Sequence, residues 1–326
     1  SPARGGGGAA RELLAADASF RCYWRLTRPD GRRAVLMDAP PPLEDVRPFL
    51  LIADRLTRNG FSAPRVLGAD VRHGWLLLED LGDDTFTRLL AAGAPEAELY
   101  RLATETLIAL HRLPPQEACP PGLPPYDRAR LVAEPMLFAD WYLPAIGRPV
   151  SAAARDDWAR LWADIVPVAR GVPETLVLRD FHVDNLLHLP ARPGAGACGL
   201  LDFQDAVRGP VTYDLMSLLE DARRDVPESL RLRETARYLA AFPDLDRAAF
   251  TASWAVLAAQ RHAKVIGIFT RLAVRDGKPG YLAHIPRVWR LLEAALSHPA
   301  LAEAAAWVHD TVPVQTRDSV PCPESP

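Results

Sequence analysis

The chain has 326 residues, of which 49% are hydrophobic and 24% charged, which excludes disordered, collagen-like and disulfide-scaffold proteins. Its 38 basic and 41 acidic residues give a formal net charge of −3, so no global field favours nucleic acid as a partner. No apolar run is long enough for a membrane span, and the Gly-rich start lacks the apolar core of a secretory signal. The four cysteines are scattered, without metal-ligand spacing, as is typical of free thiols in a cytoplasmic protein that has no structural metal.

The N-terminal part of the chain predicts a small lobe of strands and one helix. Residues 1–14 predict a disordered tail, and residues 15–81 predict the lobe. Two apolar runs flank a Pro-Asp-Gly turn and predict a β-hairpin. A helix with an Asn59-Gly60 stop and two more strands follow. The predicted elements are strands at Ser19–Arg28 and Arg33–Met37, a helix at Leu43–Arg58, and strands around Arg65–Gly68 and Gly74–Glu79.

From residue 82 to 310 the pattern predicts a larger, mainly helical lobe, and the Pro-rich residues 311–326 predict a disordered tail. Two short strands, Thr175–Leu178 and Gly199–Phe203, interrupt the helices. The fold class is therefore α+β with two lobes, and ligands bind preferentially between such lobes. The predicted helices are Pro95–Arg112, Arg128–Trp141, Arg155–Ala169, Tyr213–Arg223, Pro227–Ala241, Arg247–Arg275, Leu282–Leu296 and Ala300–Asp310.

Three polar residues follow the two short strands in an order that suits phosphoryl transfer. Asp180 and Asn185 lie five residues apart in LRDFHVDNLL, and Asp202 ends the apolar strand of GLLDFQDA. Phosphoryl transfer needs a carboxylate that orients the attacking hydroxyl and oxygen ligands that hold Mg²⁺ against the phosphates. Each residue alone could be a loop residue that makes an Asx turn. The three in this order favour catalysis.

The same residues carry a resemblance to a known family. The order of lobes and the two motifs resemble the aminoglycoside phosphotransferase and choline kinase superfamily over most of residues 17 to 295. Its usual pattern, H-G-D-x-H-x-x-N, matches Leu178–Asn185 at Asp180, His182 and Asn185. The resemblance implies a bilobal, protein-kinase-like fold with Asp180 as catalytic base. It also implies Asn185 and Asp202 as Mg²⁺ ligands.

Longer segments resemble the bacterial anomeric sugar kinases of cell-wall recycling. They include LLLEDLGDDTF, LRDFHVDNLL, LLDFQDAVRGP and YDLMSLLEDARRDV. This resemblance implies ATP, Mg²⁺ and phosphorylation of N-acetylmuramate and N-acetylglucosamine at the C1 hydroxyl. Two alternatives stay open: a phosphotransferase for aminoglycosides or other small-molecule hydroxyls, and a catalytically inactive regulator with a kinase fold. No feature of the sequence indicates an oligomeric state.

The expected nucleotide site departs from the superfamily pattern. No lysine precedes Lys264, and the first hairpin has no G-x-G. An arginine on the hairpin, where Arg21, Arg25 and Arg33 alternate and should share a face, could replace the lysine together with backbone amides near Ser19. The segment that contains Glu79 and Leu81 could present backbone groups to adenine, or be a plain linker. The nucleotide-binding candidates are Ser19, Phe20, Arg33, Glu79 and Leu81.

The sequence gives the least information about the residues that bind the acceptor. Its candidates are His182, Asp184, Asp205 and Arg261, against the alternatives of loop packing and a surface role. Arg261 also begins a basic stripe on the predicted helix Arg247–Arg275, with Lys264, Arg271 and Arg275. The stripe could be a solvated face. As part of a site it would favour a sugar that carries a carboxylate and disfavour a polycationic aminoglycoside.

Overall fold

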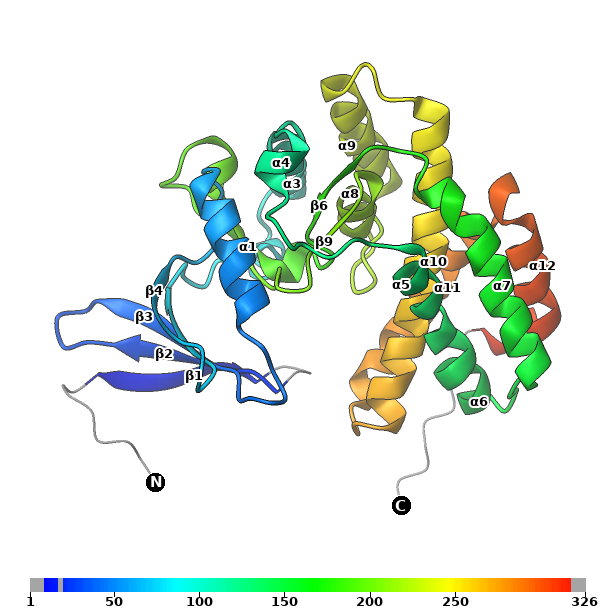
Figure 1. Ribbon diagram of the computed structural model, residues 1–326, viewed down its shortest axis with the longest axis horizontal. Helices are drawn as coiled ribbons and strands as arrows, with labels where there is room; N and C mark the ends of the chain where they lie inside the picture. The colour runs from blue at the N-terminus through cyan, green and yellow to red at the C-terminus, as the bar shows by residue number, and fades with distance from the viewer. Residues whose placement is uncertain (1–8, 17–19, 318–326) are drawn as a thin grey trace. The chain divides into compact units, whose positions relative to one another are not determined.

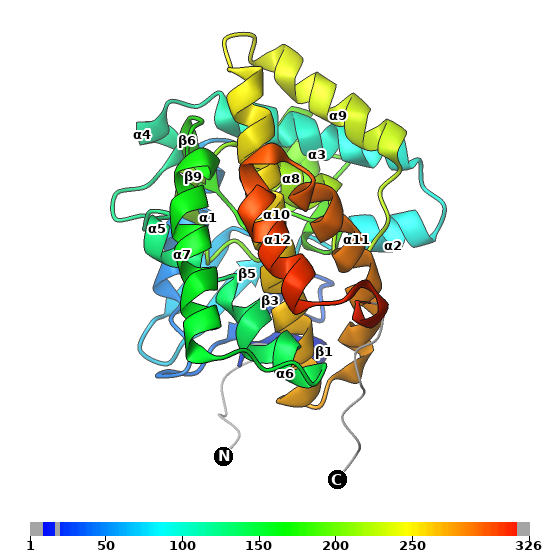
Figure 2. The same ribbon diagram turned by 90° about the vertical axis from the view of Figure 1, so that its right-hand side faces the viewer.

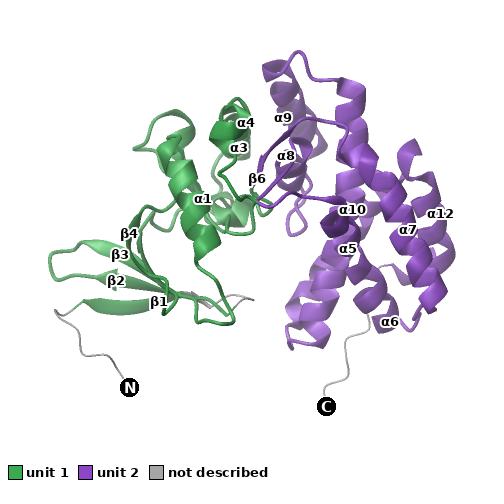
Figure 3. Ribbon diagram, in the orientation of Figure 1, with its two compact units in different colours: residues 1–123, 178–206 green, residues 124–177, 207–326 purple. Residues whose placement is uncertain are grey.

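The computed structural model describes residues 9–16 and 20–317. It divides into two compact units (Figure 3). Unit 1 comprises the described residues up to 123 together with 178–206, and unit 2 comprises 124–177 and the described residues from 207 onward. The predicted lobe boundary after residue 81 stays a prediction.

Unit 1 contains a five-stranded antiparallel sheet with the strand order β1-β2-β3-β5-β4 (Figure 1). The predicted hairpin is confirmed, because β2 and β3 pair from Cys22↔Asp38 to Thr27↔Arg33. Its turn contains Gly31 at φ 81°, a conformation that glycine adopts without strain. The strands are β1 (Ala10–Ala16), β2 (Cys22–Thr27), β3 (Arg33–Asp38), β4 (Val66–Asp70) and β5 (Trp75–Glu79).

Strand β1 corrects the predicted N-terminal tail for residues 10–14. Its sequence, ARELLAA, has no β-branched or aromatic residue, so local propensity gives no strand signal. Pairing with β2 supplies the missing stabilisation, from Ala10↔Thr27 to Ala16↔Cys22. The Arg11 guanidinium also lies 4.0 Å from the centre of the Trp24 ring.

Helix α1 (Arg47–Arg58) buries Phe49, Ile52, Ala53 and Leu56 on one face. It starts four residues later than predicted, because Pro48 occupies the first turn and the preceding residues form a turn. The predicted stop is confirmed by Gly60 at φ 82°. The other elements of unit 1 are α2 (Phe86–Ala91), α3 (Glu96–His111), α4 (Pro115–Ala118) and the paired strands β7 (Leu186–His188) and β8 (Cys198–Leu200).

Unit 2 is helical apart from the antiparallel pair β6 (Glu174–Val177) and β9 (Val207–Pro210), of which the sequence predicted only the first. Helix α10 packs against α7, α8 and α11 (Figure 2). The core of unit 2 contains Trp158, Trp162 and Trp289, all fully buried. The helices are α5 (Arg128–Ala133), α6 (Leu143–Ala145), α7 (Ala152–Ala169), α8 (Thr212–Leu219), α9 (Glu228–Ala241), α10 (Arg247–Val274), α11 (Ile285–Leu296) and α12 (Ala302–Thr311).

Two predictions for unit 2 need correction. The predicted helix Arg128–Trp141 is broken after Ala133, and a π-helical turn follows at Phe138–Tyr142. The predicted C-terminal tail is wrong for residues 311–317. There Arg317 pairs with Glu293, and its Nη2 donates to the Val312 carbonyl at 2.9 Å. The ion pair with Glu293 joins residues 24 positions apart, which a Pro-rich local pattern does not register.

None of the helices in the described part of the chain is long and apolar enough to cross a membrane. Cys22, Cys119 and Cys198 are free thiols, and Cys322 lies outside the described residues.

Candidate active site

Unit 1 contains a cavity of about 290 Å³. Sheet residues such as Val35 and Leu78 form part of its wall, and the segment Glu79–Gly82 forms another part. Asn185 and Asp202 also line it. The cavity therefore joins an apolar wall to two of the residues that the sequence singled out for metal binding.

The loop that follows β6 holds Asp180 beside Asn185. The Asn185 side-chain amide donates to the Asp180 carbonyl at 3.0 Å, and its backbone amide donates to the His182 carbonyl at 2.9 Å. Arg179 has φ 71°, which strains a non-glycine residue. The hydrogen bonds hold this strained turn. They also direct the Asn185 Nδ2 toward the loop, so that Oδ1, the atom that binds cations, faces the other way.

Asp202 follows β8, and the residue before it, Leu201, forms a hydrogen bond to the loop that contains Asp180 and Asn185. The Leu201 amide donates to the Asn185 carbonyl at 2.9 Å. Asp202 itself has φ 56°, and its Oδ1 accepts a hydrogen bond of 2.7 Å from the Gln204 side chain. The next residue, Phe203, is fully buried and stacks on Phe49 of α1 with 4.9 Å between ring centres.

The oxygen donors at this cavity are too few to hold a metal ion by themselves, but they suit Mg²⁺ that is also bound by phosphates and water. Asn185 offers an amide oxygen and Asp202 a carboxylate. Within residues 9–16 and 20–317, no group of three or more His, Cys, Asp or Glu could hold a metal ion. Magnesium is commonly held by one or two carboxylates together with substrate phosphates and water. These residues therefore fit an ion that is shared with a bound nucleotide.

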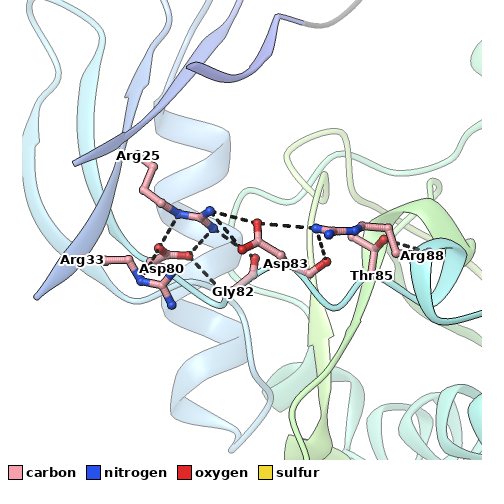
Figure 4. Close-up of polar contacts among 7 residues, drawn as sticks. All are labelled: Arg25, Arg33, Asp80, Gly82, Asp83, Thr85 and Arg88. Atoms are coloured by element: carbon pink, nitrogen blue, oxygen red, sulfur yellow. Dashed lines mark hydrogen bonds and ion pairs between the residues drawn. The ribbon is translucent and has the colours of Figure 1, made fainter. Parts of the chain in front are cut away.

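A buried ion-pair cluster fixes the segment between β5 and α2 (Figure 4). The Arg25 guanidinium donates to both oxygens of Asp80, at 2.7 and 3.0 Å, and to Asp83 at 3.0 Å. Asp80 also accepts the Gly82 amide at 2.9 Å. Burial alone would raise the pKa of Asp80, but the hydrogen bonds from Arg25 and Gly82 hold it below its ordinary value.

The structure brings some of the predicted nucleotide-binding residues to the cavity. Glu79 and Leu81 line it. Phe20 is 63% exposed and is not among the lining residues. Arg33 also lies away from the lining; its Nε is 3.6 Å from Asp80 and its side chain is 49% exposed. Ser19 lies outside the described residues.

Sequence reasoning missed Glu44. It lies in the turn before α1, where its Oε2 accepts a hydrogen bond of 2.9 Å from the Arg21 Nε. Arg21 lines the cavity, and its Nη1 lies 3.9 Å from Asp202. In protein kinases an acidic residue pairs with the phosphate-binding lysine, and a search for such an acid could have found Glu44.

The predicted acceptor residues lie in different surroundings. His182 is buried, with Nδ1 3.9 Å from Asp184, and Asp184 accepts a hydrogen bond from the Thr87 hydroxyl and lines the cavity. Asp205 is exposed. Arg261 is buried in unit 2 and donates to the Ser217 hydroxyl at 3.0 Å.

The basic stripe of α10 is largely engaged by partners. Lys264 lies 3.0 Å from Glu134, and Arg275 lies 2.6 Å from Asp276. Two of the four cations thus have an acidic neighbour within the unit. Arg271 has no ion pair within the described residues. The stripe is accordingly less positive than the sequence alone suggested.

Comparisons with known proteins place the chain in a family. The model of the phosphotransferase enzyme family matches residues 11–251. The N-acetylmuramate/N-acetylglucosamine kinase of Caulobacter vibrioides is 40% identical over 97% of this chain and 95% of its own length. The protein of the same name from Pseudomonas aeruginosa is 40% identical over 90% of this chain and 86% of its own.

A solved structure supports the fold independently of sequence. A choline/ethanolamine kinase family protein from Mesorhizobium loti superposes with a TM-score of 0.61 over 92% of both chains, at 14% identity. The predicted kinase-like fold is thereby confirmed, and the resemblance to the amino-sugar kinases is confirmed by the relatives above. The chain belongs to the phosphotransferase enzyme family.

Proposed function

We propose that the chain is an ATP-dependent sugar kinase that phosphorylates the anomeric hydroxyl of N-acetylmuramate and N-acetylglucosamine. The observation that carries this proposal is the 40% identity to a kinase of that name over 97% of the chain. The matched region includes residues of both units. The product, a sugar 1-phosphate, suits the recycling of cell-wall amino sugars in the cytoplasm, where ATP is made.

Asp180 is the base of the proposed reaction. Its carboxylate accepts the proton of the C1 hydroxyl while the hydroxyl oxygen bonds to the γ-phosphorus of ATP and the bond from that phosphorus to the ADP oxygen breaks. The strained turn at Arg179 and the hydrogen bond from Asn185 support this role, because both fix the loop before substrate binds.

Asn185 and Asp202 hold Mg²⁺ in this proposal. When bound, the ion neutralises charge on the transferring phosphates. The Leu201 hydrogen bond supports the pairing, since it ties the two ligand-bearing segments together. The apolar residues Val35 and Leu78 supply a surface for adenine, and the adjoining segment Glu79–Gly82 offers backbone groups to its ring nitrogens.

The test is to incubate the protein with ATP, Mg²⁺ and each amino sugar, and to locate the phosphate by phosphorus–proton correlation NMR. We expect coupling between phosphorus and the anomeric proton for both sugars. Kanamycin and choline serve as control acceptors. Phosphate at C6, or turnover only with a control acceptor, would assign a different substrate. ATP binding without any transfer would indicate an inactive regulator.

A further inference from the structure

The nucleotide site lacks the lysine that kinases of this fold use, although it still needs a cation near the phosphates. No lysine occurs before Lys264. Arg21, on the approach to β2, lines the cavity together with Asn185 and Asp202. Its Nη1 lies 3.9 Å from the Asp202 carboxylate. The guanidinium therefore borders the place where a metal-bound phosphate chain would end.

Glu44 fixes that guanidinium. Its Oε2 accepts the Arg21 Nε at 2.9 Å, and its Oε1 accepts the Phe20 amide at 3.2 Å. The two side chains are only 14% and 12% exposed. A guanidinium keeps its positive charge in proteins, and the hydrogen bond to Glu44 holds that of Arg21 in one orientation, which is how a preorganised anion site is built.

The two other candidate arginines, Arg25 and Arg33, are placed differently. Arg25 is enclosed by Asp80 and Asp83, and its side chain is only 8% exposed. Arg33 lies outside the cavity lining, beside Asp80 and solvent. Charge at both positions is directed at the segment that follows β5 (Figure 4). This arrangement leaves Arg21 as the hairpin arginine that borders the metal-binding side of the cavity.

We propose that Arg21 binds the phosphates of the nucleotide in place of the usual lysine, and that Glu44 is its positioning residue. This inference rests on the proposed function for the identity of the nucleotide. An arginine suits the task because its planar guanidinium donates from several N–H groups at once. Donation from Nε to Glu44 aligns the plane, and the Nη side is directed toward Asp202.

The test compares the dissociation constants of ADP and adenosine by calorimetry, with Mg²⁺ present. We expect Arg21→Gln to weaken ADP binding by about tenfold or more, as for loss of a charged hydrogen bond, and to change adenosine binding by less than about twofold. The exposed Arg28→Gln variant is the matched control and should change neither constant. Adenosine isolates the contribution of the phosphates, because it keeps the base and ribose.

A double-mutant cycle tests Glu44. Glu44→Gln should also weaken ADP binding, and the double variant Arg21→Gln/Glu44→Gln should bind ADP no more weakly than Arg21→Gln alone, because Glu44 acts through Arg21. Additive losses would overturn the positioning role. Wild-type ADP affinity in Arg21→Gln, an equal loss in Arg33→Gln, or parallel loss of adenosine binding would overturn the role of Arg21. If the ADP measurements come out as expected but the protein does not phosphorylate the amino sugars, the proposed function is rejected and the roles of Arg21 and Glu44 stand.

Discussion

At the scale of single residues, backbone strain coincides with the candidate chemistry. Within the described residues, the non-glycine residues with positive φ are Arg179 and Asp202, at 71° and 56°. Each such conformation costs on the order of 1–3 kcal/mol and persists only where its surroundings enforce it. One directly precedes Asp180, and the other is the proposed metal ligand. Strain thus occurs next to the proposed base and at the proposed metal ligand.

The role of Asp180 predicts a variant that binds but does not turn over. Asp180→Asn keeps the size of the side chain and removes the base, so kcat should fall by about 10²-fold or more. ADP affinity, measured by calorimetry, should stay within about twofold. Asp164→Asn, an exposed acid on α7, is the matched control and should keep full activity. A kcat above about one tenth of wild type would assign the base elsewhere.

The proposed ligands predict an altered metal requirement. Asn185→Ala and Asp202→Ala each remove one oxygen from Mg²⁺, so the concentration for half-maximal activity should rise by about tenfold or more, since loss of even an outer-shell partner commonly costs that much. Activity should be titrated with Mg²⁺ at fixed ATP. An unshifted midpoint in both variants would contradict the assignment. The Asp164→Asn control should match wild type.

At the scale of elements, the Arg25 cluster joins strand β2 to the segment Glu79–Gly82 (Figure 4). Asp80 is only 4% exposed, so removing Arg25 leaves a buried charge whose nearest remaining cation is the half-exposed Arg33 at 3.6 Å. Arg25→Met should therefore destabilise the protein by about 3–5 kcal/mol, measured by urea unfolding. Arg88→Ala is the control: its side chain is 67% exposed and lies 3.8 Å from Asp83, so it should cost less than about 1 kcal/mol.

The same cluster predicts a pH dependence. Because the pKa of Asp80 is held below its ordinary 3.8, its contribution to stability is complete above that pH and is lost as pH falls through the lowered value. Wild type should lose stability below pH 3.8 more steeply than Asp80→Asn, which has no carboxylate to protonate there. Melting temperatures measured across acid pH would show it. Equal slopes for the two proteins would contradict the prediction.

Helix α10 depends on a glycine where it crosses the chain near Leu137. A Cβ on Gly267 would lie 2.4 Å from the Leu137 carbonyl oxygen. Backbone cannot withdraw as a flexible side chain can, so Gly267→Ala should destabilise by about 1–3 kcal/mol despite the better helix propensity of alanine. Gly280→Ala is the matched control, because its Cβ would have no heavy atom within 4 Å. A Gly267→Ala variant as stable as this control would contradict the close packing.

At the scale of the whole molecule, the features that can be predicted from the sequence are those that local residue patterns encode. Asp180, Asn185 and Asp202 stand in short motifs next to apolar strands, so chemistry and order together mark them as candidates. Strand β1 was missed because its residues have little β propensity, and β9 was missed because it pairs with β6, which lies much earlier in the chain. The choice among three arginines likewise depends on acids 23 to 58 positions away in sequence. Such contacts leave no periodic signal.

Unit 1 is assembled from two stretches of chain, residues up to 123 and residues 178–206, and Cys198 lies in the second. Its thiol is fully buried in β8. Burial raises its pKa to about 12, so only about one molecule in ten thousand carries the reactive thiolate at pH 8. Modification of Cys198 therefore requires unit 1 to open. Cys22 and Cys119 are partly exposed and need no such opening.

If the two stretches of unit 1 unfold together, a destabilising substitution in the first stretch should expose the Cys198 thiol in the second. Arg25→Met should therefore accelerate alkylation of Cys198, followed by peptide mass spectrometry, while Cys22 and Cys119 react at nearly unchanged rates. ADP with Mg²⁺ should slow Cys198 modification, because a ligand that binds the folded protein lowers the open population. Cys198 reacting as fast as Cys22 in wild type, or at a rate that Arg25→Met leaves unchanged, would show that β7 and β8 open independently of the five-stranded sheet.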